Sequence, residues 1–283
     1  MPDELIFITG TSSGIGLASA IECAAAGFKV VATMRNLSKK DALLRAAADR
    51  KLSANVFAEA LDITSKDIDV KINELTAKYG TPFGLVNNAG IAVGGPFEEQ
   101  SDAQVREEFE TNVFGLFAAT RALIPLMRAR GRGRIVNMSS LSGRVGFPLA
   151  STYAATKHAV EGFSEALRWE LAPFGIQVCL IEPGAIKTPI FYDNLRRAAL
   201  ENKEGPYGRL SAHVEAMMMK SAFGAPPPEL VARALRKTLT CKKPAFRTLV
   251  GMDARGLVAL RWLLPERVLA WALGTAFKPS RIR

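Results

Sequence analysis

The chain has 283 residues, of which 48% are hydrophobic, and a formal net charge of +10. These values exclude a disordered chain and are typical of one large or two small globular domains. Residues 233–283 hold 12 of the 37 Lys and Arg but only 2 of the 27 Asp and Glu, so the whole positive excess lies in this tail. A uniform basic surface for nucleic acid is therefore not predicted.

Short apolar runs alternate along the chain with longer segments of helical pattern. Strands are predicted over residues 5–9, 29–33, 54–60, 85–86, 134–137, 177–181 and 247–250, and helices over 14–26, 38–51, 65–79, 101–129, 151–172 and 228–240. Several runs lack polar alternation, which is typical of strands covered on both faces. The alternation predicts an α/β fold: a doubly wound, Rossmann-like parallel sheet in a single domain, with helices on both sides.

Two regions fall outside this alternation. Residues 185–227 are long for a loop and carry Tyr207 and Met217–Met219, so we predict a helical lid. Residues 253–283 are rich in Leu and Ala, include Trp262 and Trp271, and are divided by Pro265 into two predicted helices. We therefore expect a main domain over 1–252, with the lid at 185–227, and a basic apolar helical extension over 253–283.

The extension has two interpretations. Its helices could pack on the main domain and close a pocket, which is the favoured interpretation. Alternatively, they could lie in a membrane interface with their arginines at anionic headgroups. No run of 18 uncharged apolar residues predicts a membrane span.

The three cysteines, Cys23, Cys179 and Cys241, are far apart and form no C-x-x-C motif. Neither a disulfide framework nor a metal site is predicted, and a reducing compartment is expected. The chain opens on two acidic residues and a strand rather than a basic leader. We expect a cytoplasmic protein, with peripheral contact at a membrane through residues 253–283 as the alternative.

A glycine-rich segment, Thr9-Gly10-Thr11-Ser12-Ser13-Gly14-Ile15-Gly16, follows the first strand and opens the first helix. Gly10 allows a tight turn, Gly14 lets the backbone approach a pyrophosphate, and Gly16 permits close packing of helix on strand. The amino terminus of the helix would face the phosphates. A plain strand–helix turn is the alternative, and the position inside a βαβ unit favours the dinucleotide site.

Tyr153 and Lys157 form a Y-x-x-x-K pair thirteen residues after Ser140. Positions four apart share one face of a helix, so the phenol and the ammonium can point into one pocket. A nearby cation is expected to lower the pKa of the phenol and so favour proton exchange with a carbonyl or alcohol oxygen. Ser140 would bind the same oxygen; Ser139 is the alternative, and the spacing favours Ser140.

These motifs together resemble the short-chain dehydrogenase/reductase family over roughly residues 4–250. The resemblance rests on G-x-x-x-G-x-G, Asn87-Asn88-Ala89-Gly90, Asn112, Ser140 and the Tyr153/Lys157 pair. It implies that Tyr153 is the acid/base, that Ser140 positions the substrate oxygen, and that Asn112 anchors a water in a proton relay toward Lys157. Asn112 could otherwise be an ordinary helix asparagine.

The same resemblance implies a set of cofactor contacts. Asn88, Ala89 and Gly90 would shape the adenosine side, Asp62 and Ile63 would meet the adenine, and Tyr153 and Lys157 would contact the nicotinamide ribose. The segment Pro183-Gly184-Ala185-Ile186-Lys187-Thr188 would hold the carboxamide through Ile186 and Thr188. The full expected set is Gly10, Ser12, Ser13, Gly14, Ile15, Gly16, Arg35, Asp62, Ile63, Asn88, Ala89, Gly90, Tyr153, Lys157, Pro183, Gly184, Ile186 and Thr188. Asp62 could instead be a helix cap before Thr64.

The residues after the second strand bear on the choice between NAD(H) and NADP(H). A carboxylate there would accept hydrogen bonds from a ribose 2′-hydroxyl and repel a 2′-phosphate. The sequence Val31-Ala32-Thr33-Met34-Arg35-Asn36 contains no acid, and Arg35 can pair with a phosphate. NADP(H) is therefore predicted, with Ser12 as a second phosphate contact; a solvated Arg35 and dual cofactor use is the alternative.

The substrate is predicted to be an apolar alcohol or carbonyl compound, because no cluster of cations accompanies Phe147-Pro148-Leu149 beside the expected pocket. The stretch 30–37 and the Lys243-Pro244 turn resemble the branch of estradiol 17-beta-dehydrogenase and retinol dehydrogenases, which implies steroid, retinoid or long-chain substrates. A homodimer is expected because the resembled family commonly forms homodimers. A non-catalytic dinucleotide sensor and a membrane-associated interaction protein remain the alternatives to an enzyme.

Overall fold

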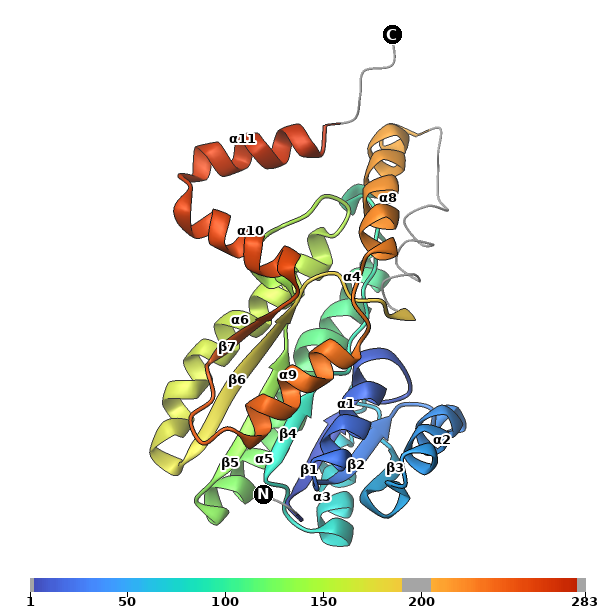
Figure 1. The fold of residues 1–283 in the computed structure, drawn as a ribbon, viewed down its shortest axis with the longest axis vertical. Helices are drawn as coiled ribbons and strands as arrows, with labels where there is room; N and C mark the ends of the chain where they lie inside the picture. The colour runs from blue at the N-terminus through green and yellow to red at the C-terminus, as the bar shows by residue number, and fades with distance from the viewer. Residues whose placement is uncertain (1–2, 190–204, 279–283) are drawn as a thin grey trace.

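In the computed structural model, which describes residues 3–189 and 205–278, seven parallel strands form one sheet (Figure 1). Their order is β3-β2-β1-β4-β5-β6-β7. The strands are β1 Leu5–Thr9, β2 Lys29–Met34, β3 Val56–Ala60, β4 Gly84–Asn87, β5 Gly133–Met138, β6 Ile176–Pro183 and β7 Arg247–Val250. The predicted fold class is confirmed, and every predicted strand is present with its bounds shifted by at most two residues.

Helices cover both faces of the sheet, and each face has its own hydrophobic core. The helices are α1 Gly14–Ala25, α2 Asp41–Asp49, α3 Ile68–Tyr79, α4 Asp102–Phe109, α5 Gly115–Arg130, α6 Ser151–Leu171 and α9 Glu229–Thr240. One core joins the sheet to α1, α2 and α9, and the other joins it to α3, α5 and α6. In β1, Ile6 and Ile8 enter the first core while Leu5 and Phe7 enter the second, because successive side chains of a strand point to opposite faces.

The strand order reverses between β1 and β4, and loops from both strands meet there. β1 pairs with β2 on one side and with β4 on the other. The Thr9 hydroxyl at the end of β1 accepts hydrogen bonds from the backbone N–H groups of Asn88 and Ala89, which follow β4. Such a reversal leaves a crevice beyond the carboxyl ends of the strands, where ligands of doubly wound folds bind.

The helix predicted over 101–129 is interrupted by a turn of π-helix. α4 ends at Phe109, residues Glu110–Phe114 form the π-helical turn, and α5 begins at Gly115. Asn112 lies inside this turn, and its side chain bonds to groups outside the helix, as described below. Single π-helical turns inside α-helices are frequent at functional sites, so the interruption marks this position.

The lid and the extension are helical where the structure describes them. α8 spans Gly208–Phe223 within the lid, α10 spans Met252–Leu263 and α11 spans Glu266–Ala276, so the break at Pro265 is confirmed. Residues 190–204 of the predicted lid lie outside the described part. In Figure 1, α8, α10 and α11 lie beyond the carboxyl edge of the sheet, at the end opposite the amino terminus. No described helix is both long and apolar enough to cross a bilayer.

Candidate active site

Tyr153, Lys157 and Ser140 come together at the carboxyl end of β5. Tyr153 and Lys157 lie in the first two turns of α6, and the Lys157 Nζ is 5.6 Å from the centre of the Tyr153 ring. The Ser140 side chain hydrogen-bonds Tyr153 and accepts a hydrogen bond of 3.1 Å from the backbone N–H of Ser142. The choice of Ser140 fits this geometry, because the hydroxyl of Ser139 is buried and has no hydrogen-bond partner among the described residues.

The pKa of Tyr153 departs from the expected direction. Burial raises this pKa to about 12, the hydrogen bond from Ser140 opposes the rise, and the negative charge of Glu108 adds to it. The expected net lowering of this pKa is therefore wrong, because burial outweighs every effect that favours the phenolate. Burial lowers the pKa of Lys157 itself to about 8, and its Nζ donates to the Met138 carbonyl oxygen at 2.9 Å. The phenol therefore keeps its proton at neutral pH.

Asn112 joins three parts of the site. Its Nδ2 donates to the carbonyl oxygen of Ile91 at 2.8 Å and to the Thr156 hydroxyl at 3.1 Å, and its Oδ1 accepts from the Ile91 N–H at 2.9 Å. The π-helical turn, the segment after β4 and α6 are thereby held together. Asn112 bonds to the neighbour of Lys157 in α6 rather than to Lys157.

A buried carboxylate that sequence reasoning missed lies behind the site. Glu108 in α4 is fully buried, and its Oε1 accepts a hydrogen bond of 2.9 Å from the Val93 N–H. Its charge raises the pKa values of both Tyr153 and Lys157. Because the sequence Arg106-Glu107-Glu108-Phe109-Glu110 has acids on several faces of a helix, no pattern distinguishes the buried one.

A second missed group is a buried ion cluster beside α6. Glu182 at the end of β6 contacts Arg144 at 3.3 Å and Arg247 at 3.4 Å, and Arg247 also contacts Glu161 of α6 at 3.0 Å. Burial and the neighbouring Glu161 raise the pKa of Glu182 to about 7, against the effect of the two arginines. The cluster ties the loop after Ser140 to α6 and to two strands.

The glycine-rich loop has the conformation that its sequence predicted. Gly10 and Gly14 have φ values of +72° and +55°, which favour glycine. A Cβ at Gly16 would collide with the carbonyl oxygen of Gly10 and with Asn88 Nδ2. The close approach of α1 to the loop after β1 is therefore possible only because residue 16 has no side chain. Ser13 is the N-cap of α1, yet its side chain makes no capping bond.

This loop fits the diphosphate of a dinucleotide. The first N–H groups of α1 have no acceptor within the helix, and a helix amino terminus favours anions. Ser12 is half-buried and Ser13 is exposed beside these amides. Gly14 faces the Thr188 side chain, so the loop and the predicted carboxamide segment border one space. The residues present therefore suit the cofactor that the sequence implied.

Of the residues expected to contact the adenosine, Asn88 and Ala89 lie next to this loop. Asn88 Nδ2 donates to the carbonyl oxygens of Thr9 and Gly10, both at 2.9 Å, and so holds the loop against β4. The Asp62 Oδ1 accepts from the N–H and hydroxyl of Thr64, at 3.0 and 2.8 Å. Asp62 thus stabilises the turn after β3 and is not a helix cap, because α3 begins only at Ile68 with Asp67 as its N-cap. Ile63 is buried, and Gly90 lies against Asn112.

At the carboxyl end of β6, the segment from Pro183 to Thr188 is bound to the extension. The Ala185 N–H donates to Asp253 Oδ2 at 2.7 Å, and a Cβ at Gly184 would collide with the same carboxylate. Ile186 and Thr188 are buried, and the Thr188 hydroxyl lies 3.4 Å from the carbonyl oxygen of Ile186. The segment is thereby held by Asp253 at Gly184 and Ala185 and by burial at Ile186 and Thr188.

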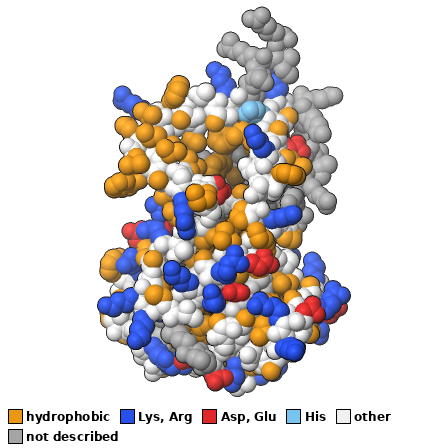
Figure 2. Space-filling model, viewed as in Figure 1, with side chains coloured by type: hydrophobic (Ala, Val, Ile, Leu, Met, Phe, Trp, Pro, Cys, Tyr) orange, Lys and Arg blue, Asp and Glu red, His pale blue; other side chains and the backbone are white. Residues whose placement is uncertain are grey.

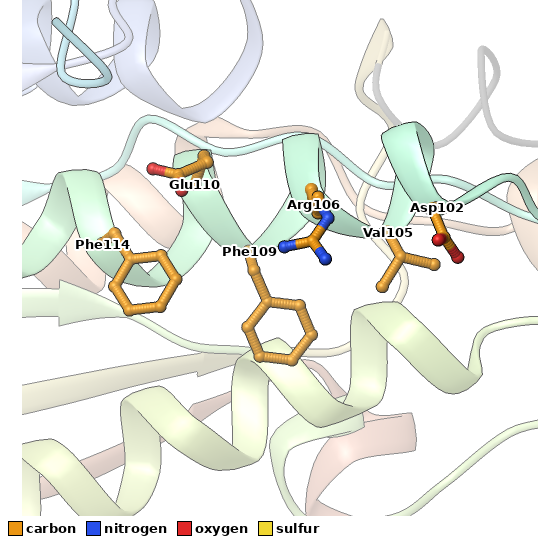
Figure 3. A pocket seen from close by; sticks show the side chains of 6 residues that line it. All are labelled: Asp102, Val105, Arg106, Phe109, Glu110 and Phe114. Carbon is orange, nitrogen blue, oxygen red and sulfur yellow. The ribbon is translucent and has the colours of Figure 1, made fainter.

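Two surface hollows lie along α4 and the π-helical turn. One, of about 420 Å³, is lined by Arg35, Thr64, Lys66, Glu107, Glu110 and Thr111. Arg35 is exposed and has no ion-pair partner in the described part of the chain. The other, of about 320 Å³, contains none of the expected site residues; Figure 3 shows Phe109, Phe114 and Arg106 among the side chains along it. Lys66 was missed because nothing in the sequence joins it to Arg35.

The geometry just described is that of a nucleotide-dependent oxidoreductase, and comparison with known proteins agrees. A family model described as short chain dehydrogenase matches residues 4–198. The chain belongs to the short-chain dehydrogenase family and is an enzyme of the oxidoreductase class.

Several curated relatives match over nearly the whole chain, and two of them have a named activity. A 3-ketodihydrosphingosine reductase of Bacteroides thetaiotaomicron is 32% identical, covering 96% of this chain and 97% of the relative. An NADPH-dependent 3-dehydrocapnine reductase of Ornithobacterium rhinotracheale is 32% identical and covers 93% of each. Human retinol dehydrogenase 8, from the branch that the sequence resembled, is 40% identical but covers 65% of this chain and 59% of its own.

A solved structure of a short-chain dehydrogenase from Streptomyces avermitilis has the same fold. It is 36% identical, covers 92% of this chain and 93% of its own, and superposes with a TM-score of 0.78. The fold therefore extends beyond the residues that the family model matches.

Proposed function

We propose that this enzyme uses NADP(H) to interconvert a hydrophobic alcohol and its carbonyl compound, with Tyr153 as the proton donor and acceptor. One observation carries the proposal: the Ser140, Tyr153 and Lys157 side chains meet at the end of β5, beside a glycine loop suited to a dinucleotide. A sensor that only binds a nucleotide has no need of this arrangement.

The nicotinamide group, when bound, supplies or accepts the hydride, and the side chains move and hold the proton. In the reducing direction, Tyr153 donates its phenolic proton to the carbonyl oxygen as that oxygen gains charge, and Ser140 donates a second hydrogen bond to it. A phenol whose pKa is raised to about 12 is reliably protonated for this step. In the oxidising direction Tyr153 first releases its own proton toward solvent through the proposed relay, and the phenolate then accepts the proton of the alcohol.

Lys157 and Asn112 have supporting roles in the proposal. The Lys157 ammonium lies beneath the Tyr153 ring and favours the phenolate that forms when the proton leaves. Asn112 fixes α6 against the segment after β4, and so holds Lys157 in place through its neighbour Thr156. A water on Asn112 that carries protons toward Lys157 remains part of the proposal.

The preference for NADP(H) is supported by Arg35. Its guanidinium follows β2, is exposed and faces a hollow that Lys66 also lines, so two cations can meet a 2′-phosphate there. Ser12 would supply a third contact. The Ornithobacterium relative is named as an NADPH-dependent enzyme, which also favours NADP(H).

The substrate is proposed to be a long-chain or other largely apolar ketone or alcohol. Phe147 and the buried Leu149 lie on the loop between Ser140 and Tyr153, and Met217 and Met218 lie on the lid helix α8. The Bacteroides relative is named for a sphingoid ketone, which is a long-chain compound. Steroids and retinoids stay within the same class.

The chemistry can be tested by NADPH oxidation with a panel of aliphatic, steroid and retinoid ketones. Tyr153→Phe is expected to lower kcat by about 100- to 10,000-fold, while Tyr79→Phe, which changes a tyrosine on α3, keeps the parent rate. A Tyr153→Phe enzyme that turns over at the parent rate would refute the proposed mechanism.

The cofactor preference can be tested separately with Arg35→Ser. Loss of a charged contact to a 2′-phosphate is expected to lower kcat/KM for NADPH by about 10- to 100-fold and to leave kcat/KM for NADH nearly unchanged. Equal losses of kcat/KM with NADPH and NADH would show that Arg35 does not contact the 2′-phosphate.

We also propose that the enzyme is a homodimer that pairs through the face of Figure 3, between α4 and α5. Phe114 is about half exposed there, and Val105 and Phe109 extend the apolar surface along the same hollow. Light scattering of Phe114→Asp against the parent tests this. A dimeric variant would exclude this face as the contact.

A further inference from the structure

The extension exposes an unusual share of the large apolar side chains. Of the 14 such side chains exposed in the described residues, six lie between residues 252 and 271: Met252, Leu260, Trp262, Leu263, Val268 and Trp271. Trp262 and Trp271 are 86% and 72% exposed. Figure 2 shows hydrophobic side chains gathered over this end of the molecule, with basic side chains beside them. Scattered apolar residues are ordinary on a surface, but a cluster of this kind marks a contact.

The extension contacts the rest of the enzyme at its two ends, and most of its residues between these contacts are exposed to solvent. At its start, Asp253 accepts the hydrogen bond from Ala185. At its far end, the Ala276 carbonyl oxygen lies 3.0 Å from His213 Nε2 of α8, and the Phe277 ring meets Phe147 edge-on with centroids 6.2 Å apart. Between these attachments Leu269 is the one buried residue of α11.

The exposed middle part, residues 260–271, contains the turn at Pro265 and is called the α10–α11 corner below. The favoured expectation, that the extension packs on the domain, holds only at the two attached ends. In the corner, the exposed Arg261 and Arg267 flank the apolar side chains, with Glu266 as the one acid. A helix pair with exposed tryptophans, leucines and arginines matches the composition of elements that lie in a membrane interface.

We propose that the α10–α11 corner docks on an anionic lipid bilayer and lies in its interface. The proposal goes beyond the proposed oxidoreductase activity and does not depend on it. Charge favours this partner over a second copy of the chain, because the whole excess of ten positive charges lies in residues 233–283 and two copies would bring like charges together. None of the helices in the described residues is long and apolar enough to cross a bilayer, and the contact that we propose is peripheral.

Docking would also place the mouth of the active site near the lipid. Both attachments of the extension are on segments that border the site: Ala185 follows β6, and Phe147 lies between Ser140 and Tyr153. A long-chain ketone dissolved in the bilayer would then reach the site without crossing water. This consequence, unlike docking itself, rests on the proposed function.

Docking is tested by flotation of the full chain with vesicles of phosphatidylcholine alone or mixed with phosphatidylglycerol. We expect recovery with the mixed vesicles, falling with added salt. Trp262→Ser/Trp271→Ser and Arg261→Gln/Arg267→Gln are each expected to lower the partition coefficient by about tenfold or more. The control is Trp169→Ser, because Trp169 is also 65% exposed but lies near the far end of α6. Equal flotation of all four proteins would overturn the proposal.

The three tryptophans allow a direct measurement. A variant that keeps Trp262 alone should lose fluorescence with bromine-labelled phospholipid in the vesicles, and one that keeps Trp169 alone should not. If Trp262→Ser/Trp271→Ser lowers the mass of the particle in solution but leaves flotation unchanged, the corner binds a second copy and the lipid proposal is wrong.

Activity separates this proposal from the proposed function. The corner variants should reduce a water-soluble ketone at the parent rate and lose activity only toward a long-chain ketone presented in anionic vesicles. Turnover of the soluble ketone without flotation would refute docking and leave the hydride chemistry standing; flotation without turnover of any ketone would do the opposite.

Discussion

The strand β6 and the helices α10 and α11 have similarly apolar sequences but opposite environments. Seven of the eight residues of β6 are buried, whereas Ala254 and Leu269 are the buried residues of the two helices. β6 lies between β5 and β7 and under helices, so each of its faces has a partner. α10 and α11 follow the last strand and have no such partner among the described residues. Apolar content alone therefore does not determine burial; the position in the fold does.

The largest effect expected in the buried region concerns Lys157. Because burial lowers its pKa to about 8 while the pKa of Tyr153 is raised to about 12, Lys157 is the first of the pair to lose its proton as the pH rises. We expect kcat/KM for ketone reduction to fall by about tenfold per pH unit above this value. Lys157→Met should cost about 100-fold or more at neutral pH.

A second variant tests whether the fall in kcat/KM at high pH is caused by Lys157. Lys157→Arg keeps a positive charge at all accessible pH values, so the fall should move to higher pH in the residual activity. A limb that stays near 8 in this variant would belong to another group.

Two glycines sharpen the contrast between close packing and open surface. Gly16→Ala places a methyl group against the Gly10 carbonyl and Asn88. We expect it to lower the free energy of unfolding by about 1–3 kcal/mol and to weaken NADPH binding. Gly162→Ala in α6 has no neighbour within 4 Å and should be neutral or stabilising by up to about 1 kcal/mol. Chemical denaturation and cofactor titration measure both, and equal results would contradict the packing.

A smaller effect is expected from Glu182. Folding raises the pKa of the Glu182 carboxyl from 4.5 to about 7. This carboxyl therefore stabilises the folded protein at pH values below its unfolded pKa of 4.5, and the stabilisation is lost as the pH rises through about 7. Glu182→Gln should therefore raise Tm relative to the parent at about pH 8 and have little effect on Tm at about pH 5. The corresponding change in the free energy of unfolding at about pH 8 is on the order of 1 kcal/mol. A Tm difference that does not change with pH would show that Glu182 does not bind its proton more tightly in the folded protein.

The smallest effect on stability is expected in the α10–α11 corner. Trp262→Ser removes a side chain that is 86% exposed, so the free energy of unfolding should change by no more than about 0.5 kcal/mol. A loss of several kcal/mol in urea denaturation would mean that Trp262 is buried in solution, and would remove the contrast between the two regions.

The sheet could be predicted, and the candidate catalytic residues could be singled out, because their sequence signals are local. Continuous apolar runs such as residues 5–9 occur where a strand is covered on both faces, and Tyr153 and Lys157 are one helical turn apart. Glycines that require positive φ, such as Gly10 and Gly14, are likewise visible one at a time.

The missed features depend on contacts between distant residues. The π-helical turn at Asn112 is held by Ile91 and Thr156, and nothing within 101–129 indicates it. The same holds for the backbone of Leu149, whose φ is +62° although it is not glycine. The direction of the Tyr153 pKa also depends on how deeply the ring is buried, which the sequence does not give.

The contact between Asp253 and the segment after β6 has a consequence for shortened forms of the enzyme. A chain ending at Gly251 would lose the carboxylate that receives the Ala185 N–H and fills the space beside Gly184. The segment that we propose to contact the nicotinamide carboxamide would then lose this support. Deleting the extension is thus expected to disturb the proposed chemistry and the proposed lipid contact together, and only single side-chain replacements can separate the two.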